Sequence, residues 1–114
     1  GGPEIDWIKK VAPGCTWVTS VCTGALMLHR AGYLTGKRAT THWRSIPLLR
    51  EAGGVEVLED VRYVRDGNIV TSAGVSAGID MALWLMGEIY GPAFARFVQK
   101  GIEYFPAPPY TGEA

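Results

Sequence analysis

Cys22 lies in a sequence context that is typical of a reactive thiol. Apolar and β-branched residues precede it over 16–21, and Thr23 and Gly24 follow it before a helix-forming run. This order predicts a strand that turns sharply into a helix, with the thiol at the corner. A thiol at such a corner faces solvent near the positive end of a helix dipole, and both features favour the reactive thiolate. The stretch therefore predicts chemistry that begins at the Cys22 sulfur.

The two residues after Cys22 indicate how a negative charge on a group bound at the sulfur would be stabilised. Ligand sites of open α/β sheets gather beyond the carboxyl ends of strands, and Cys22 is predicted to lie at such an end. The backbone amides of Thr23 and Gly24 would point toward a group bound at the sulfur and act as an oxyanion hole. Thr23 would add a hydroxyl donor. The competing interpretation is that Cys22 is a small, buried and inert apolar residue.

His42 is the next candidate, because it follows a predicted short strand over 37–41. Neighbouring strands would bring its imidazole near Cys22, where it could act as a base or an orienting donor. The alternative is a structural imidazole that bonds to backbone. His29 is expected to be a surface or packing residue. Asp80 is expected to pair with an arginine or a helix terminus, with a direct catalytic role as the alternative.

Neither a metal nor another cofactor is expected. The two cysteines, Cys15 and Cys22, would point to opposite faces of one strand, roughly 20 Å apart at about 3.3 Å per residue. A disulfide between them is therefore not predicted. Neither Cys-x-x-Cys nor His-x-x-x-His spacing occurs, so the sequence offers no recognisable ligand set for a metal ion.

The composition is that of a globular domain, and a single domain over 1–114 is expected. Eleven basic and eleven acidic residues give a net charge of +0. Without a basic stripe, neither nucleic acid nor an anionic membrane is an expected partner, and a small-molecule substrate is. The apolar run 81–86 is too short to span a bilayer. No segment of signal-peptide type opens the sequence, so a cytoplasmic location is expected.

The elements that would position these residues alternate between helix and strand. Asp66-Gly67 lies between two β-rich runs and predicts the turn of an antiparallel hairpin. Ser76 is a candidate cap for the helix that follows. These patterns predict a layered α/β fold with a partly parallel sheet. Helices are predicted from Pro3 until Pro13-Gly14, from after Cys22 to about Ala31, over 46–52, from the Ser76 cap to Tyr90, and over 93–104. Strands are predicted over 15–21, 37–41, 55–58, 61–65 and 68–72.

Two further expectations concern the C-terminal part. The helix over 75–90 carries apolar residues at helical spacing, which predicts that this face packs on the sheet. The face consists of Val75, Ile79, Leu83, Met86 and Tyr90. The proline-rich tail 105–110 is expected to run extended over the surface.

Several blocks of the sequence resemble the ThiJ/PfpI superfamily, which belongs to the class I glutamine-amidotransferase-like fold. They occur in the order 18–25, 31–43, 64–74, 75–80 and 101–109. Together they are most similar to the isocyanide hydratase branch. The resemblance covers almost the whole chain and implies a flavodoxin-like sandwich, a cysteine in a strained elbow, and a homodimer.

The resemblance also assigns roles to residues. It implies that Cys22 is the nucleophile, that Thr23 and Gly24 line the pocket beside it, and that His42 matches a histidine near the cysteine of some members. The family's N-terminal half carries an Asp or Glu that hydrogen-bonds the cysteine sulfur, and these 114 residues contain no counterpart of that half. Either the chain is a fragment, or a second polypeptide supplies that half, or the protein is a truncated relative. We therefore expect the activating carboxylate to lie outside these 114 residues.

Three functions are consistent with these patterns. The first is hydration of a small electrophilic carbon, most concretely of an isocyanide to an N-substituted formamide. The second is another reaction of the superfamily, such as glyoxalase, deglycase or peptidase chemistry. The third is a non-enzymatic ligand or redox sensor, since regulators of the arabinose type share the fold. The sequence shows no basic DNA-binding segment after the proline-rich tail, which disfavours the regulator.

Overall fold

The computed structural model describes residues 2–105. These residues fall into two compact units, which divide between Met81 and Ala82. Helix α4 (Val75–Tyr90) begins in the first unit and continues in the second. None of the helices in the described part of the chain is long and apolar enough to cross a membrane. The tail predicted to run extended lies outside the described residues, apart from Phe105.

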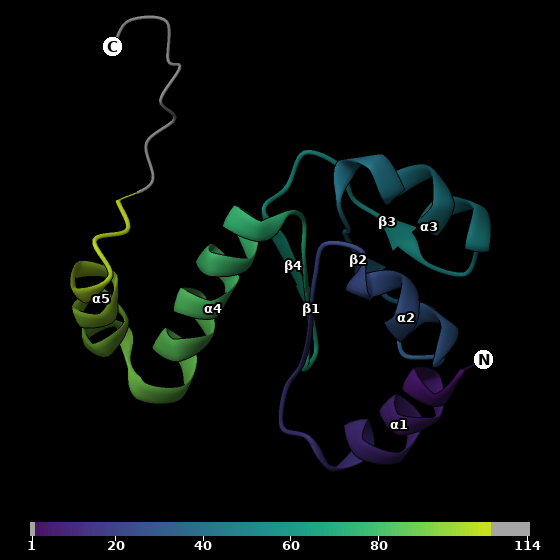
Figure 1. Cartoon of the computed structure of the whole chain (residues 1–114), viewed down its shortest axis with the longest axis horizontal. Coiled ribbons are helices and arrows are strands. Elements are labelled where there is room, and N and C mark those ends of the chain that lie inside the picture. Colours follow the sequence, from purple (N-terminus) through teal and green to yellow (C-terminus); the bar gives the residue numbers. More distant parts are fainter. Residues whose placement is uncertain (1, 106–114) are drawn as a thin grey trace, which may run out of the picture. The chain divides into compact units, whose positions relative to one another are not determined.

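The strands of the first unit form a three-stranded sheet and a two-stranded sheet (Figure 1). In the larger sheet β1 (Val18–Val21) pairs in parallel with β5 (Ile69–Ser72), and β5 pairs antiparallel with β4 (Tyr63–Asp66). In the smaller sheet β2 (Arg38–Ala39) and β3 (Glu56–Val57) are parallel. The strand order β1-β5-β4 makes β1 an edge strand among the described residues. This is the partly parallel α/β arrangement that the sequence predicts.

Helices follow and precede these strands as the apolar patterns predict. Proline occupies the first turn of α1, α3 and α5, where the missing N–H costs no hydrogen bond. Acidic residues open α1 and lysines close it, which complements the helix dipole. The remaining helices are α1 (Pro3–Val11), α2 (Gly24–Arg30), α3 (Ile46–Ala52) and α5 (Pro92–Gly101), with 3-10 turns at Ala12–Gly14 and Trp43–Ser45.

Two glycines show how helices cover both faces of β1. A Cβ atom at Gly24, the first residue of α2, would lie 3.4 Å from the Ser20 Cβ. A Cβ atom at Gly78, near the start of α4, would lie only 2.9 Å from the Val21 Cγ1. Successive residues of a strand point to opposite faces, so α2 and the start of α4 lie on opposite sides of the sheet. The layered architecture expected from the sequence is present in this unit.

The core of the first unit lies between the strands and the helices α1, α2 and α3. Leu34 and Leu49 are fully buried there, and Ile8 and Val18 pack against the buried cluster. Burying side chains of this size stabilises a fold by about 1.5–3 kcal/mol each. The cluster consists of Ala25, Leu28, Leu34, Ala39, Leu49 and Ile69.

The strands are shorter than predicted. The segment 15–17 is not part of β1, because the 3-10 turn Ala12–Gly14 leads into it and pairing with β5 begins only at Val18. The hairpin is confirmed, but Asp66 and Ile69 are paired, so the turn residues are Gly67 and Asn68. Gly67 supplies the positive φ of +64° at the first turn position, which glycine tolerates best.

The predicted packing face of α4 is wrong for the part that lies in the first unit. Val75 and Ile79 are exposed, whereas Ala77, Gly78 and Met81 are buried. The close approach of Val21 explains the difference, because only a face with small residues lets the helix lie so near β1.

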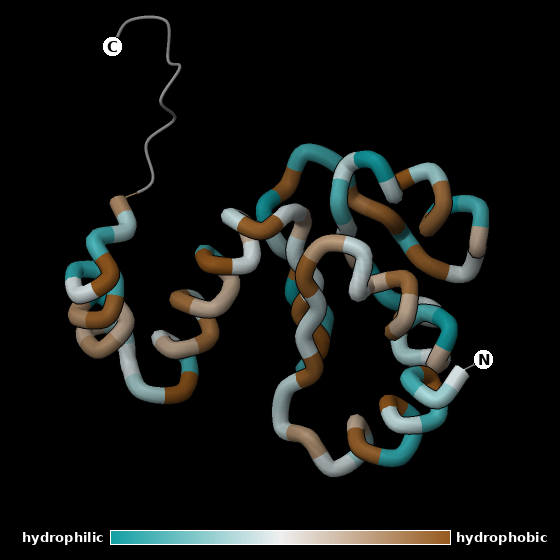
Figure 2. The backbone as a smooth tube through the Cα atoms, viewed as in Figure 1, coloured by the Kyte–Doolittle hydropathy of each residue, from teal (hydrophilic) through white to brown (hydrophobic). Residues whose placement is uncertain are grey.

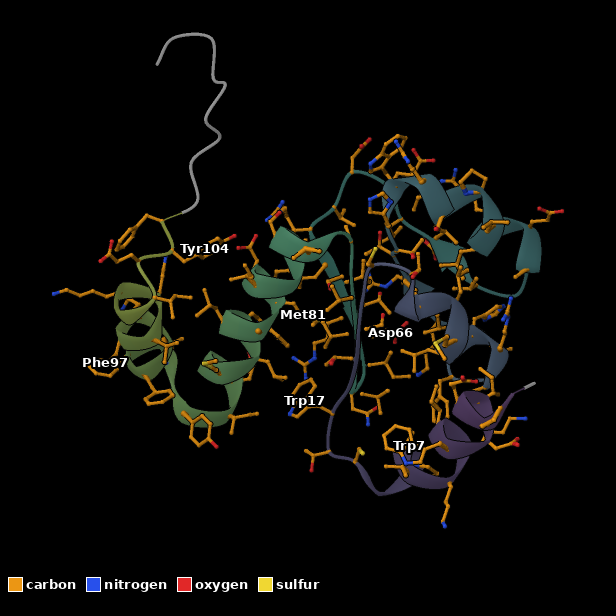
Figure 3. The ribbon with its side chains drawn as sticks, viewed as in Figure 1. Trp7, Trp17, Asp66, Met81, Phe97 and Tyr104 are labelled. Carbon is orange, nitrogen blue, oxygen red and sulfur yellow. The ribbon has the colours of Figure 1, made fainter. Side chains whose placement is uncertain are left out.

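The start of α4 and the end of α5 also differ from the prediction. Ser76 lies inside α4 rather than capping it, and its hydroxyl accepts a bond from Arg62 at 3.3 Å. The last helix, α5, ends at Gly101 rather than at Tyr104. In the second unit, hydrophobic and hydrophilic residues are interspersed along α5 (Figure 2), and the Phe97 side chain is exposed (Figure 3).

Candidate active site

Cys22 lies at the corner between β1 and α2, as predicted. Its φ angle is +59°, in the left-handed region that residues with a side chain seldom adopt. Holding a non-glycine residue there costs about 1–3 kcal/mol, and such strain concentrates at functional sites. The Cys22 side chain is half-buried. The strained elbow that the resemblance implies is therefore a feature of this chain.

Both backbone polar groups of Cys22 are hydrogen-bonded to other segments. Its N–H donates to the Ala73 carbonyl at 2.7 Å, just beyond the end of β5. Its carbonyl accepts a bond from the Thr41 hydroxyl, also at 2.7 Å. Thr41 is only 1% exposed, so water does not compete for this bond. Sequence reasoning missed Thr41 and Ala73, although the Thr40-Thr41 pair before His42 offered a signal.

A layer of buried hydroxyl groups supports the same corner. The Ser72 hydroxyl donates to the Ser20 carbonyl at 2.8 Å, and the Thr71 hydroxyl accepts the Thr40 N–H at 2.9 Å. The Thr40 hydroxyl donates to the Leu58 carbonyl at 2.8 Å. Buried polar groups that are satisfied in this way fix the relative positions of the segments that carry them. The carboxyl ends of β1, β2 and β5 are joined by these bonds.

Thr23 and Gly24 follow the sulfur at the start of α2. Thr23 is exposed, and its hydroxyl caps no backbone amide of the helix. Within residues 2–105, the Thr23 N–H makes no hydrogen bond to another protein group. The described residues thus leave this amide without a protein acceptor. Whether it stabilises a developing charge stays a prediction.

The His42 ring is hydrogen-bonded to the backbone of a nearby residue. Its Nδ1 accepts the N–H of Arg44 at 3.2 Å, which caps the 3-10 turn Trp43–Ser45. In this bond Nδ1 must be unprotonated. The ring lies 5.7 Å from that of Trp43, and its Cδ2 faces Gly74. These contacts support the structural alternative for His42, and no hydrogen bond joins its ring to Cys22 in the described part of the structure.

His29 and Asp80 also have structural partners. The His29 Nε2 bonds the Gly53 carbonyl at 2.8 Å and ties α2 to the loop after α3. Asp80 pairs with Arg62, whose Nε donates to Oδ2 at 2.7 Å. The arginine pairing expected of Asp80 is therefore confirmed. Burial raises the pKa of nearby Tyr63, and the negative charge of Asp80 raises it further.

The described residues supply neither a carboxylate partner for Cys22 nor a metal site. Glu4 and Asp6 lie on α1, and no carboxylate in residues 2–105 hydrogen-bonds the Cys22 sulfur. In the same range no three His, Cys, Asp or Glu side chains group as metal ligands would. Cys15 and Cys22 are both free thiols, as predicted.

Two hollows lie near the corner. A cavity of about 530 Å³ is lined by His42, Gly74 and residues of α3, but not by Cys22. Because it does not present the thiol, we assign it no part in the reaction. A shallower groove of about 350 Å³ follows β1 and is walled by α1 and α2. Trp7 of α1 and Trp17 before β1 both line it (Figure 3).

Comparison with known proteins assigns the chain to a protein family. The sequence model of the DJ-1/PfpI family matches residues 4–88, and the chain belongs to that family. A crystal structure of a ThiJ/PfpI family protein from Pseudomonas syringae superposes with a TM-score of 0.84 at 34% identity. That match covers 96% of this chain and 45% of the solved one. The flavodoxin-like α/β fold expected from the resemblance is confirmed.

Two curated relatives are similar to most of this chain. The isonitrile hydratase of Pseudomonas putida is 50% identical over 106 residues, which are 93% of this chain and 46% of the relative. The transcriptional regulator CdhR of Pseudomonas aeruginosa is 33% identical over 84% of this chain and 29% of its own length. The chain thus spans less than half the length of these curated relatives. Its family contains both enzymes and regulators.

Proposed function

We propose that the whole protein is a cysteine-dependent hydratase that converts an isocyanide to an N-substituted formamide, with Cys22 as the nucleophile. One observation carries the proposal: a half-buried cysteine is held at φ +59° at a strand-to-helix corner. Strain of this kind persists only where surrounding bonds maintain it, as Ala73 and Thr41 do here. The similarity to an isonitrile hydratase supports the choice of substrate.

The proposed reaction uses few groups. The Cys22 thiolate attacks the terminal carbon of R–NC, a sulfur–carbon bond forms, and an acid delivers a proton to that carbon. Water then adds to the carbon of the resulting thioimidate and the nitrogen takes up a proton. The carbon–sulfur bond breaks, which releases R–NH–CHO and restores the thiol. The N–H groups of Thr23 and Gly24 are the proposed donors to the charge that develops on the way.

Turnover of para-nitrophenyl isocyanide by the whole protein tests the proposal. Cys22→Ala should abolish formamide production, because it removes the attacking atom. Cys15→Ser is the matched control, since Cys15 is an exposed free thiol outside the corner, and it should retain wild-type turnover. Full activity of Cys22→Ala would exclude this mechanism.

Assays on the same purified protein distinguish two alternative functions. Conversion of methylglyoxal without conversion of isocyanide would favour a glyoxalase or deglycase reaction. The similarity to the regulator CdhR supports a sensor as the other alternative. A redox sensor would form sulfinic acid at Cys22 at low peroxide but turn over neither substrate.

We further propose that the acid for this reaction lies on an additional polypeptide segment that pairs with β1. Val18 donates its N–H to Asn68 on the β5 side, and alternate residues face alternate edges, so Thr19 and Val21 present their backbone groups to the other edge. Unpaired edges of this kind accept further strands. The groove beside β1 gives apolar side chains of such a strand a place to pack.

Ser20 supports the same proposal. It is only 6% exposed and lines the groove, and its hydroxyl has no hydrogen-bond partner in the described structure. A buried hydroxyl without a partner costs about 1–3 kcal/mol, so a polar group of an added strand would stabilise the assembly. A second polypeptide would supply such a strand, and a homodimer is the other assembly we propose.

A further inference from the structure

The carbonyl group of Cys22 is held by a residue distant in the sequence. Thr41, two residues after the end of β2, donates its hydroxyl proton to this carbonyl at 2.7 Å. Thr41 is 1% exposed, and the Cys22 carbonyl is the only acceptor recorded for its hydroxyl within residues 2–105. A hydrogen bond in a buried place is stronger than one in water, because no solvent competes for either partner.

This bond also sets the direction of the Thr23 N–H. The carbonyl of Cys22 and the amide of Thr23 belong to one planar peptide unit, and in a trans unit they point in opposite directions. No cis peptide occurs among the described residues. A hydroxyl that fixes where the Cys22 oxygen points therefore fixes where the Thr23 N–H points.

The left-handed conformation of Cys22 makes this hydrogen bond from Thr41 necessary. At φ +59° the backbone lies outside its usual energy well, and the peptide after it would rotate toward a relaxed arrangement if released. The N–H of Cys22 is already held by Ala73 on the other side of the residue. The Thr41 bond is the restraint on the carbonyl side, which is the side shared with Thr23.

We propose that Thr41 is a positioning residue, whose hydroxyl aims the Thr23 N–H at the negative charge that develops when the Cys22 sulfur attacks a substrate. The inference rests on Cys22 being the nucleophile, as proposed above. Thr41 itself touches neither the sulfur nor a substrate. It acts through the peptide plane that joins Cys22 to Thr23.

Two chemical probes separate this role from a general structural one. With para-nitrophenyl acetate, the thiolate attacks the carbonyl carbon and the π electrons move to oxygen, giving an oxyanion. The oxyanion then collapses and expels para-nitrophenolate, which leaves an acetyl thioester on Cys22. With iodoacetamide, the sulfur displaces iodide directly from the methylene carbon and no oxyanion forms. Only the first reaction gains from a correctly aimed N–H.

The experiment measures both rates for the native assembly as purified, with Cys15→Ser in this chain, so that Cys22 is the one thiol of these 114 residues that can react. Removing an oxyanion donor outright costs about 100- to 1000-fold, and a misdirected donor should cost less. Thr41→Val should therefore lower the acylation rate about tenfold relative to the alkylation rate. Thr41→Ser keeps the hydroxyl and should restore the ratio. If Thr41→Val does not fold, Thr41→Ala should change the ratio in the same direction.

Thr40→Val is the matched control. Thr40 is adjacent, equally buried at 1% exposure, and donates to the carbonyl of Leu58 rather than to that of Cys22. Its loss should reduce stability but leave the ratio of the two rates unchanged. An unchanged ratio in folded Thr41→Val, or an equal fall in Thr40→Val, would overturn the positioning role. Failure of Cys22 to react with either probe in the native assembly without the Thr41 substitution would instead overturn the nucleophile assignment on which the inference rests.

Discussion

At the scale of single residues, the left-handed backbone of Cys22 costs free energy that its two hydrogen bonds offset. Ala73 accepts the N–H and Thr41 donates to the carbonyl, so the corner is held from two different segments. The position of Cys22 at this corner was predictable, because a β-branched run, a thiol and a glycine follow one another in the sequence. Thr41 was not predictable as its partner, because that contact depends on how the fold brings the segment after β2, which belongs to a different sheet, to the corner after β1.

The strain at Cys22 can be measured by substitution. Glycine adopts a positive φ at little cost, whereas alanine pays about 1–2 kcal/mol there. Cys22→Gly should therefore be more stable than Cys22→Ala by about 1 kcal/mol in urea denaturation. Equal stability of the two variants would show that the corner is not strained. The comparison is free of effects from losing the thiol, because both variants lack it.

His42 shows the limit of sequence reasoning at this scale. His42 was predicted to follow a strand over 37–41, but β2 ends at Ala39 and lies in a different sheet from β1. Its proximity to Cys22 stays a prediction. Its ring, however, accepts a backbone N–H from Arg44 only two residues away. Such local capping depends on the conformation of the 3-10 turn Trp43–Ser45, which the residue types did not predict.

At the scale of elements, the hairpin, the helices α1 and α3, and the alternation of helix and strand were predictable from local patterns. Apolar periodicity failed for α4, where Val75 and Ile79 are exposed and Gly78 is buried against Val21. Periodicity finds the apolar face of a helix. It does not reveal that a strand side chain needs the space that only a glycine leaves.

The contact between α4 and β1 gives a prediction at this scale. Gly78→Ala would place a methyl group 2.9 Å from the Val21 Cγ1, and a β-branched side chain cannot move away easily. Overpacking of this kind should destabilise the chain by about 1–3 kcal/mol in urea denaturation. Val21→Ala should remove most of that penalty in the double variant. Additive effects of the two substitutions would contradict direct packing between these residues.

At the scale of the whole molecule, the feature that most needs a partner is the edge of β1 that pairs with no strand in residues 2–105. Family membership and fold are established by the match over residues 4–88 and by the superposition on a solved relative. The cytoplasmic location, the homodimer and the single domain stay predictions. They depend on surroundings and assemblies that local residue patterns do not encode.

Amide hydrogen exchange tests whether an added strand pairs with β1. In the 114-residue chain alone, the amides of Thr19 and Val21 should exchange fast, because they face the unpaired edge. In the assembly as purified under native conditions they should be protected. The Val18 amide, bonded to Asn68, is the internal control and should be protected in both. Fast exchange of Thr19 and Val21 in the native assembly would contradict the proposed pairing, and its intact mass would distinguish a second polypeptide from a second copy.

The central claim is that the Cys22 sulfur forms a covalent bond to the substrate carbon during turnover. Fragment mass spectrometry of the native assembly, quenched while it converts para-nitrophenyl isocyanide, tests this most directly. The account predicts an added mass of one isocyanide on Cys22 and none on Cys15, together with release of the N-substituted formamide. Formamide release with no adduct on Cys22, at a rate that Cys22→Ala shares, would contradict it.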